Sequence, residues 1–224
     1  MADFSLGLRP AHFRPLLGDG IFTQDGAAWK ASRDLVRPQF KETRSKSFKW
    51  IQTEIEALID KLKNASGTID LQPLFFRLTL NTTMAVLFGK SMEALEKESP
   101  IKEAEFAKAF DDAQHRLAER GRLGDFYWIL SGRKFAQSCA TVHRFVDAIV
   151  ASSLKDADAD GIAKENGSIG DPDRYVFVQA LIASTRNRKV LRDQLINILL
   201  AGRDTTACLL SWTLYVQGLP QSIH

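Results

Sequence analysis

The chain has 224 residues, of which 45% are hydrophobic and 25% charged, and its 30 Lys and Arg exceed its 27 Asp and Glu by three. These values are ordinary for a folded globular protein and exclude a chain that is disordered along its length. The small net charge gives no support by itself to nucleic-acid binding. The two cysteines, Cys139 and Cys208, are too few for a disulfide framework. The first ten residues lack a signal-peptide pattern, and no uncharged apolar run reaches the ~18 residues of a membrane span.

Apolar residues recur with helical spacing along the first half of the chain. The helices expected there cover residues 27–37, 47–63, 73–88 and 100–121. Pro38 is expected to stop the first of them, and Gly89 follows the end of the third. Since no strand-like alternation and no internal repeat are found, the predicted fold class is mainly α.

The second half predicts three further helices, over residues 134–154, 173–184 and 187–217. One face of the first is apolar: Phe135, Cys139, Val142, Phe145, Val146, Ile149 and Val150. Cys139 is therefore interpreted as a core residue rather than a nucleophile. Residues 155–172 are rich in acidic residues and glycine, and we expect an exposed loop there. The last helix is nearly apolar all round, which is typical of the interior of a large helical protein.

The middle of that last helix contains a polar interruption, Ala201–Thr206. A glycine inside a helix costs about 1 kcal/mol relative to alanine, and threonines are stiff and can bond back to the preceding turn. Arg203 and Asp204 bring charge into an otherwise apolar helix, which is unfavourable unless the charges are paired. Local violations of this kind concentrate at functional sites.

Helical spacing places Gly202, Thr205 and Thr206 on one face. On the functional interpretation, Gly202 lets a flat ligand approach the backbone, and the hydroxyls with the Asp204 carboxylate handle a proton at that ligand. On the structural interpretation, the same residues make a kink that lets the helix pass its neighbours. These residues alone favour neither interpretation.

Trp29 and Arg33 are four residues apart and so share a helix face. Both side chains only donate hydrogen bonds, which suits a ligand that carries a carboxylate. The surrounding segment, residues 29–50, holds seven Lys and Arg against Asp34 and Glu42, so an acidic partner or nucleic acid could dock there. The alternative is a solvated helix face with a cation–π pair.

Together these motifs resemble the cytochrome P-450 family of haem-thiolate monooxygenases. The segment Ala201–Thr206 is similar to the A-G-x-D-T-T segment that binds oxygen on the family's long central helix, and Trp29 with Arg33 is similar to its haem-propionate pair. Residues 20–40 resemble microsomal members, nearest to fungal hydroxylases of alkanes and fatty acids. The resemblance extends from about Gly18 to Val216, and it implies a fragment of the P-450 fold.

The resemblance implies a role for each residue of the two motifs. The implied catalytic residues are Asp204, Thr205 and Thr206, and the implied cofactor-binding residues are Trp29, Arg33, Ala201, Gly202 and Thr205. Thr205 would hydrogen-bond bound dioxygen, and Asp204 would relay protons to it. Ala201 and Gly202 would shape a groove over the haem, while the tryptophan and arginine would hold a propionate.

The resemblance also implies partners. Haem would be the cofactor, and NADPH would supply electrons through a cytochrome P-450 reductase that docks on the basic surface around Lys30 and Arg37. The substrate would be a lipophilic small molecule such as an alkane or fatty acid, with Phe and Leu side chains of residues 100–130 lining its channel. The expected location is the cytoplasmic face of the endoplasmic reticulum membrane.

The family's iron ligand is a cysteine in an F-x-x-G-x-R-x-C-x-G loop after the long helix, and neither Cys139 nor Cys208 lies in such a loop. We therefore expect residues 1–224 to form one partial domain without a metal ligand. We further expect that the chain alone does not bind haem as a thiolate, and that part of its long helix is exposed. Residues 217–224 do not resemble the family, and association with a membrane is expected only through the family's N-terminal segments, which have no match here.

Two other functions are carried forward from the sequence. One is a helical fragment without catalysis that binds a lipophile or a partner helix. The other is a nucleic-acid-binding domain that uses Lys30 to Lys49, which the absence of any known reading motif disfavours.

Overall fold

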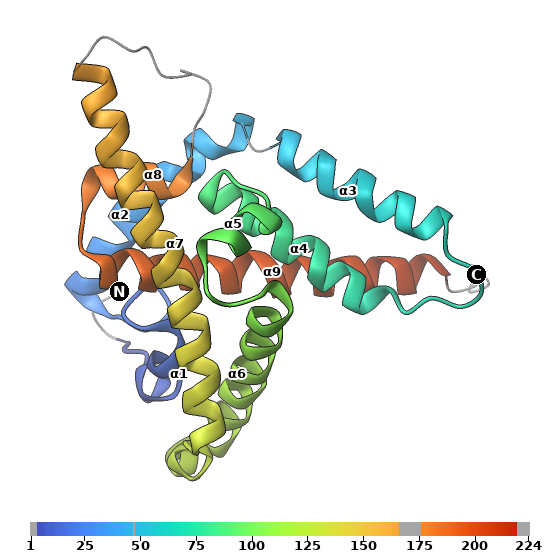
Figure 1. The fold of residues 1–224 in the computed structure, drawn as a ribbon. Coiled ribbons are helices and arrows are strands. Elements are labelled where there is room, and N and C mark those ends of the chain that lie inside the picture. The colour runs from blue at the N-terminus through green and yellow to red at the C-terminus, as the bar shows by residue number, and fades with distance from the viewer. Residues whose placement is uncertain (1–3, 47, 166–175, 219–224) are drawn as a thin grey trace.

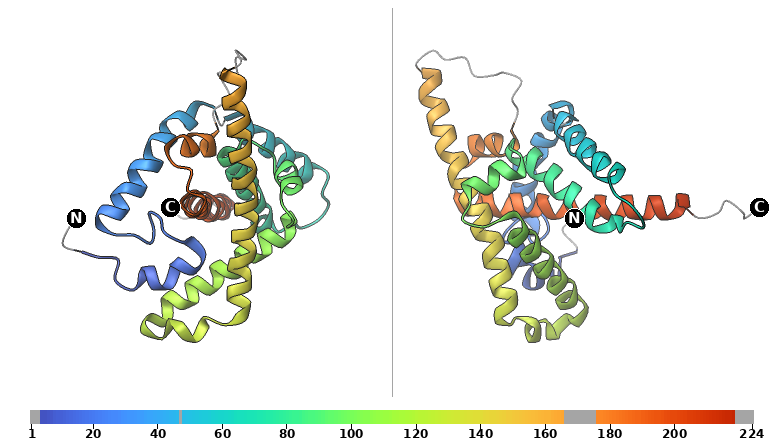
Figure 2. Two further views of the ribbon diagram at one scale, coloured as in Figure 1. Left: turned by 60° about the vertical axis from the view of Figure 1, so that its left-hand side comes forward. Right: turned by 45° about the vertical axis from the view of Figure 1, so that its right-hand side comes forward.

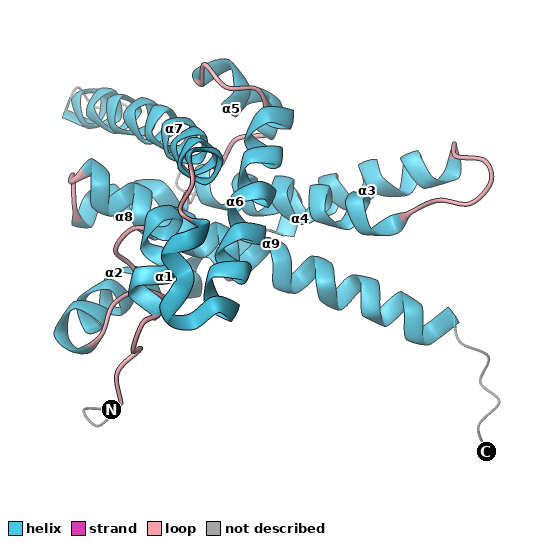
Figure 3. Cartoon of the chain, turned by 90° about the horizontal axis from the view of Figure 1, so that it is seen from below, coloured by secondary structure: helices cyan, strands magenta, loops and turns pink. Residues whose placement is uncertain are grey.

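The structure, a computed structural model, describes residues 4–46, 48–165 and 176–218, without the side chains of residues 41–46 and 160–165. Every regular element in these ranges is helical, as Figure 3 shows, so the predicted mainly α fold class is confirmed. The elements are α1 (Arg9–Leu17), α2 (Gly26–Lys46), α3 (Phe48–Lys63), α4 (Leu71–Phe88), α5 (Met92–Glu98), α6 (Glu103–Leu123), the short 3-10 helix η1 (Gly124–Leu130), α7 (Arg133–Glu165), α8 (Phe177–Ser184) and α9 (Arg188–Gly218).

Helix α4 ends where its sequence predicts, and it begins two residues before the predicted start, at Leu71. The Asp70 carboxylate accepts a hydrogen bond from the backbone N–H of Gln72 at 3.1 Å, which caps the first turn. Gly89 ends the helix in the left-handed region, with φ +63°. A side chain at Gly89 would also meet Val176 at 2.7 Å, so both conformation and space require glycine there.

The expectation that Pro38 stops the first long helix is wrong, because α2 continues through Pro38 to Lys46. A proline inside a helix lacks the N–H that would bond to the carbonyl four residues earlier. Here that carbonyl belongs to Asp34, and both residues are exposed. Water can therefore take the place of the missing donor, which makes the proline tolerable.

The expected loop at residues 155–172 is also wrong over its first part, because α7 extends to Glu165. Two of the acidic residues that suggested a loop form ion pairs from the side of this helix. Asp156 meets Lys90 at 2.8 Å, and Asp158 meets Arg186 at 2.5 Å. Residues 166–172 of the expected loop lie outside the described residues.

Helix α9 runs through the middle of the molecule (Figure 1). Helix α4 packs along it, while α7 crosses it and carries α6 on its lower part. Seen along its axis in Figure 2, α9 lies between α2 on one side and α7 on the other. Its last turns extend beyond the other helices, as the second view of Figure 2 shows. No described helix is both long and apolar enough to cross a membrane.

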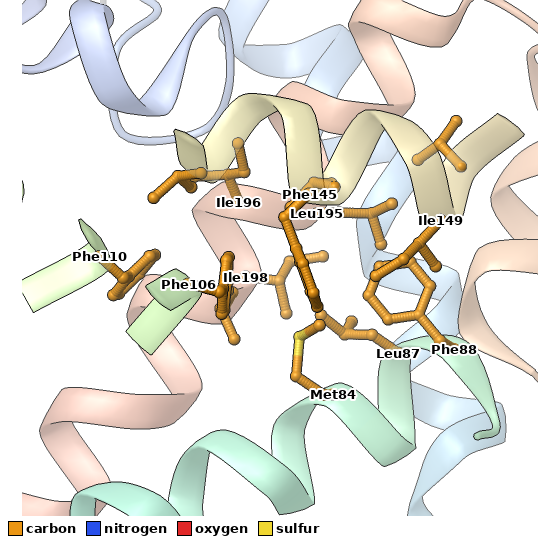
Figure 4. Packing of buried hydrophobic residues seen from close by; sticks show 14 of the residues in the cluster. Met84, Leu87, Phe88, Phe106, Phe110, Phe145, Ile149, Leu195, Ile196 and Ile198 are labelled. Atoms are coloured by element: carbon orange, nitrogen blue, oxygen red, sulfur yellow. The ribbon is translucent and has the colours of Figure 1, made fainter. Parts of the chain in front are cut away.

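The hydrophobic core lies where α4, α6 and α7 meet the first half of α9 (Figure 4). Phe106 of α6 stacks on Phe145 of α7 with ring centroids 4.2 Å apart. All seven residues of the apolar face predicted on α7 are buried, Cys139 among them. Burial raises the pKa of the Cys139 thiol to about 12, so its core role is confirmed. Phe106, Phe110 and Leu117 are buried in the same core, and the channel lining implied for Phe and Leu residues of 100–130 stays a prediction.

A buried polar seam, formed by Asp193, Gln194 and Asn197, joins α9 to the loop before α2. The Asn197 amide donates to the carbonyl of Leu17 at 2.9 Å and accepts from the backbone N–H of Phe22 at 3.2 Å. The Asp193 carboxylate accepts from the backbone N–H of Asp19 at 2.9 Å. Because these contacts fix the loop, they also fix where α2 starts relative to α9.

Candidate functional site

The polar interruption Ala201–Thr206 lies where α9 leaves the core. The helix stays α-helical from Arg188 to Gly218, so the interruption makes no break. The Thr205 hydroxyl does bond back, donating to the carbonyl of Ala201 at 2.6 Å. The hydroxyl satisfies its own donor in this way, within the unbroken helix.

Gly202 packs against helix α4. A Cβ at this position would lie 2.7 Å from the Thr83 hydroxyl oxygen and 3.1 Å from its methyl carbon. The space left by the missing side chain is occupied by Thr83, and the implied role of Gly202 in a groove over haem stays a prediction. The glycine lets two helices approach closely, which agrees with the structural interpretation of this residue.

Arg203 and Asp204 belong to a polar cluster between α9 and α6. The Arg203 guanidinium meets the carboxylate of Asp111 at 2.6 Å, the amide oxygen of Gln114 at 3.1 Å and Asp204 at 3.4 Å. The Gln114 amide also donates to the Asp204 carboxylate. The two charges that looked out of place in the sequence are therefore paired with each other and with α6.

The pKa of Asp204 is raised to about 6, mainly by burial. The positive charge of Arg203 opposes this rise, and the negative charge of Asp111 adds to it. A carboxyl group with such a pKa exchanges protons near neutral pH, which suits a proton donor or acceptor. In the described structure it forms no hydrogen bond with Thr205, because its partners are Gln114 of α6 and Arg203.

The side of α9 that carries Thr205 is uncovered. Thr205 and Thr206 are exposed, Ala201 is half-buried, and Cys208 is exposed one turn further on. Arg203 points the other way, because two residues turn a helix through about 200°. Helix α9 thus presents a polar cluster to α6 and a face of small residues and hydroxyls to open space.

Trp29 and Arg33 lie on α2 as predicted, with the indole half-buried and the guanidinium exposed. The Arg33 guanidinium lies 5.5 Å from the centre of the Trp29 ring, which is the cation–π pair that the sequence left open. In the described part of the chain, neither the Arg33 guanidinium nor the indole N–H has a hydrogen-bond acceptor. Their donors remain available to a ligand.

One contact connects α2 with α9 close to this pair. The Ser32 hydroxyl, buried beside Arg33 in the sequence, accepts a hydrogen bond from the Gln194 amide at 2.7 Å. Gln194 lies two turns before Ala201 on α9. The two motifs are thus carried by helices that touch. The cavity described between these helices, about 580 Å³, is lined by none of Trp29, Arg33, Gly202 and Thr205.

The sequence did not reveal the α6 side of the cluster. Asp111 and Gln114 carry no motif and are 92 and 90 residues before their partners Arg203 and Asp204. The only available signal was the pair of charges in an apolar helix, which requires partners without naming them. Among the described residues, no group of three or more His, Cys, Asp or Glu is placed to hold a metal ion.

The family model of cytochrome P450 matches residues 3–217, nearly the whole chain. The chain belongs to the cytochrome P450 family. This match ends where the sequence predicted a tail unlike the family, and residues 219–224 of that tail lie outside the described residues.

Curated P450 relatives and solved P450 structures both resemble this chain. It is 48% identical over 198 residues to a cytochrome P450 of Arthroderma benhamiae, a match that covers 88% of this chain and 39% of the relative. It is 44% identical over 224 residues to cytochrome P450 52A5 of Candida maltosa, covering 96% and 41%. Among solved structures, the heme domain of cytochrome P450DA matches 95% of this chain and 45% of its own, with a TM-score of 0.69 and 21% identity. This P450 chain thus spans about two fifths of the length of the curated relatives.

Proposed function

We propose that this chain forms the oxygen-side half of a haem monooxygenase that hydroxylates long-chain alkanes or fatty acids. Its membership of the P450 family and its 44% identity to a relative named P450 52A5 support the proposal. The observation that carries it is the uncovered face of α9, where Ala201 and Thr205 stand together. Thr205 and Thr206 are exposed there, and in the described structure the Thr205 hydroxyl bonds only to its own helix.

The residues fit a planar group that bears carboxylates. Ala201 and Thr205 are small enough for a flat ring to lie over the helix, and no described side chain covers Thr205. Trp29 and Arg33 offer donors without acceptors, and a propionate would supply acceptors for both. Gly202 is left out of this assignment, because Thr83 fills its space.

Haem with a thiolate ligand supplies the activation of dioxygen for oxygen insertion. This chain's residues would bind and orient the reactants around it. Thr205 would give up its bond to the Ala201 carbonyl and offer its hydroxyl as a hydrogen-bond donor toward the open face, where haem would supply the oxygen chemistry. Asp204, with its pKa near 6, would hold the proton that the reaction consumes and would have to turn from Gln114 to deliver it. Thr206, also exposed, would stand beside this path.

The rest of the proposal rests on the family. Electrons would come from NADPH through a cytochrome P450 reductase, which would dock on the exposed basic residues of α2, Lys30 and Arg37 among them. The protein would work at the cytoplasmic face of the endoplasmic reticulum membrane. By itself, the 224-residue chain would not bind haem as a thiolate and would not turn over.

A chimera tests this assignment. Residues 3–217 replace the matching segment of the full-length Candida maltosa relative, and the reduced carbon-monoxide difference spectrum is recorded. We expect the band of thiolate-ligated haem from the chimera and no such band from the 224-residue chain alone. Arg33→Ala should lower the haem content of the chimera. A folded chimera without haem, or a thiolate band from the chain alone, would contradict the proposal.

Thr205 has a matched control on the same helix. Thr213 is also exposed, and its hydroxyl likewise donates to the carbonyl four residues earlier, at 2.8 Å. In the chimera, Thr205→Val should keep the haem but lower the product formed per NADPH consumed, whereas Thr213→Val should leave this ratio unchanged. Equal ratios for both variants would remove Thr205 from the site.

The alternative of a fragment that binds a lipophile or partner without haem is favoured by one observation, the exposed apolar side chains at the end of α9. Tight lipid binding by a chimera that takes up no haem would support it. The nucleic-acid alternative gains nothing from the described residues, and the side chains of residues 41–46 lie outside the description.

A further inference from the structure

A cavity of about 570 Å³ lies between α4 and α6, with α9 at its base. Pro73, Phe76 and Leu80 of α4 and Ala107 of α6 form apolar walls, and Arg203 reaches it from α9. Because the Arg203 side chain points about 200° around the helix from Thr205, this cavity is separate from the face assigned to haem. Its volume falls in the range of small-molecule sites.

Arg203 brings unused hydrogen-bond donors to this cavity. Its side chain is only 3% exposed, and its guanidinium lies 5.0 Å from the ring centre of Phe76 and 5.3 Å from that of Phe110. A guanidinium has five N–H donors, and only Asp111, Gln114 and Asp204 accept from this one. The buried Nε has no partner in the described structure. A buried donor without an acceptor is unfavourable. Because this Nε is closed to solvent, a ligand oxygen in the cavity reaches it only when the Arg203 side chain turns toward the cavity.

The charges around the cavity balance. Its lining includes the cations Arg77, Lys102 and Arg203 and the anions Glu96, Glu103 and Asp111. Arg77 pairs with Glu103 at 3.2 Å, and Lys102 with Glu96 at 3.5 Å. An added carboxylate would meet three acidic side chains and find each cation already paired. The site therefore suits a neutral ligand better than an anion.

We infer that this cavity binds a neutral lipophile with one hydrogen-bond-accepting oxygen, such as a medium-chain ketone or ester. The apolar chain lies against Phe76, Leu80 and Ala107, and the oxygen accepts from the Arg203 guanidinium. The inference needs neither haem nor turnover, so it stands or falls apart from the proposed function.

Titration of the purified 224-residue chain with 2-octanone, followed by ligand-observed NMR, tests the site. We expect saturable binding that Ala107→Trp weakens at least tenfold, because the indole fills the cavity. The matched control is Ala118→Trp, which places the same side chain at an exposed position of α6 and should leave the affinity unchanged. No saturable binding, or equal binding by the wild-type chain and Ala107→Trp, overturns the inference.

Two further measurements test the chemistry. Arg203→Met keeps a long apolar side chain and removes every donor, so 2-octanone should bind about tenfold more weakly, as expected for loss of one hydrogen bond to a charged group. Octanoate should bind the wild-type chain more weakly than 2-octanone. Tighter binding of octanoate overturns the assignment to neutral ligands. If Arg203→Met does not fold, the two Ala→Trp variants still test binding in the cavity, and the octanoate comparison still tests the preference for neutral ligands.

Discussion

The two halves of α9 use polar residues in opposite ways. In the first half, Asp193 and Asn197 are fully buried, and their side chains hold the backbone of the loop before α2. In the second half, Thr205 and Thr206 are exposed, and Thr205 bonds only to its own helix. Polar residues that are buried and bonded to distant backbone hold the fold, whereas exposed ones that bond to nothing else remain free for a ligand.

The largest effect on the free energy of unfolding should come from a substitution in the first half of α9. Asn197→Leu removes the partners of the Leu17 carbonyl and the Phe22 N–H in a buried place, which should lower the free energy of unfolding by about 3 kcal/mol. Urea unfolding measures it. Gln217→Leu, an equivalent change at the exposed end of α9, should stay within about 0.5 kcal/mol. Similar losses in both variants would contradict the contrast between the halves.

Gly202→Ala should have a smaller effect on the free energy of unfolding, and the sign of this effect should depend on the residue at position 83. Gly202→Ala should lower the free energy of unfolding by about 1 kcal/mol, since its Cβ meets Thr83. With Thr83→Ala already in place the clash is gone, and the same substitution should stabilise the helix by up to about 1 kcal/mol. Thr83→Val keeps the branched side chain and should give no such rescue. Denaturant midpoints of the single and double variants check this.

Ionisation of Asp204 should lower the free energy of unfolding by about 1 kcal/mol as the pH rises. This value is smaller than the pKa shift implies, because the carboxylate is partly exposed. Its folded pKa of about 6 lies above the ordinary aspartate value of 3.8, so its charged form opposes folding. The protonated carboxyl favours the folded state, so its contribution to stability is complete below about pH 4 and is lost as the pH rises through 6. Asp204→Asn, compared with the wild type in urea at pH 4 and pH 7, should be the more stable of the two at pH 7 only. The same difference in the free energy of unfolding between Asp204→Asn and the wild type at both pH values would argue against the raised pKa.

The smallest effect on stability should come from the end of α9. Leu209 is 66% and Trp212 61% exposed, so the expected apolar exposure of the long helix is confirmed. Changing both to serine should alter the free energy of unfolding by less than about 0.5 kcal/mol while lowering the binding of a hydrophobic dye and raising the monomer fraction on size exclusion. Phe4→Ser, at a single exposed residue, should change neither readout.

Apolar periodicity predicted the helices, because the buried residues of a helix recur at helical spacing within one short segment of the chain. The buried face of α7 and the end of α4 at Gly89 follow from local sequence alone. The continuation of α7 past Leu154 could not be predicted, because it depends on partners such as Lys90, which is 66 residues away from Asp156. The burial of Arg120 in α6 could not be predicted either, since its guanidinium donates to the distant carbonyls of Ala11 and His12 as well as to groups of Tyr127 and Ser131.

The candidate site divides in the same way. The motifs located Thr205 on an open face and the Trp29–Arg33 pair on α2, and the roles proposed for them remain to be tested. Helical spacing could not tell which neighbour fills the space at Gly202, because Thr83 precedes it by 119 residues. It likewise could not direct Asp204 toward Gln114 rather than toward the threonines.

The contact between Gly202 and Thr83 also limits how this pair of positions can diverge. With a Cβ only 2.7 Å from the Thr83 oxygen, the helices cannot accept a larger residue at one position unless the other shrinks or the axes separate. Homologues that carry alanine or serine in place of Gly202 should therefore carry glycine or alanine opposite it. A larger side chain at one of these two positions should therefore be accompanied by a smaller one at the other, so that their summed side-chain volume stays nearly constant.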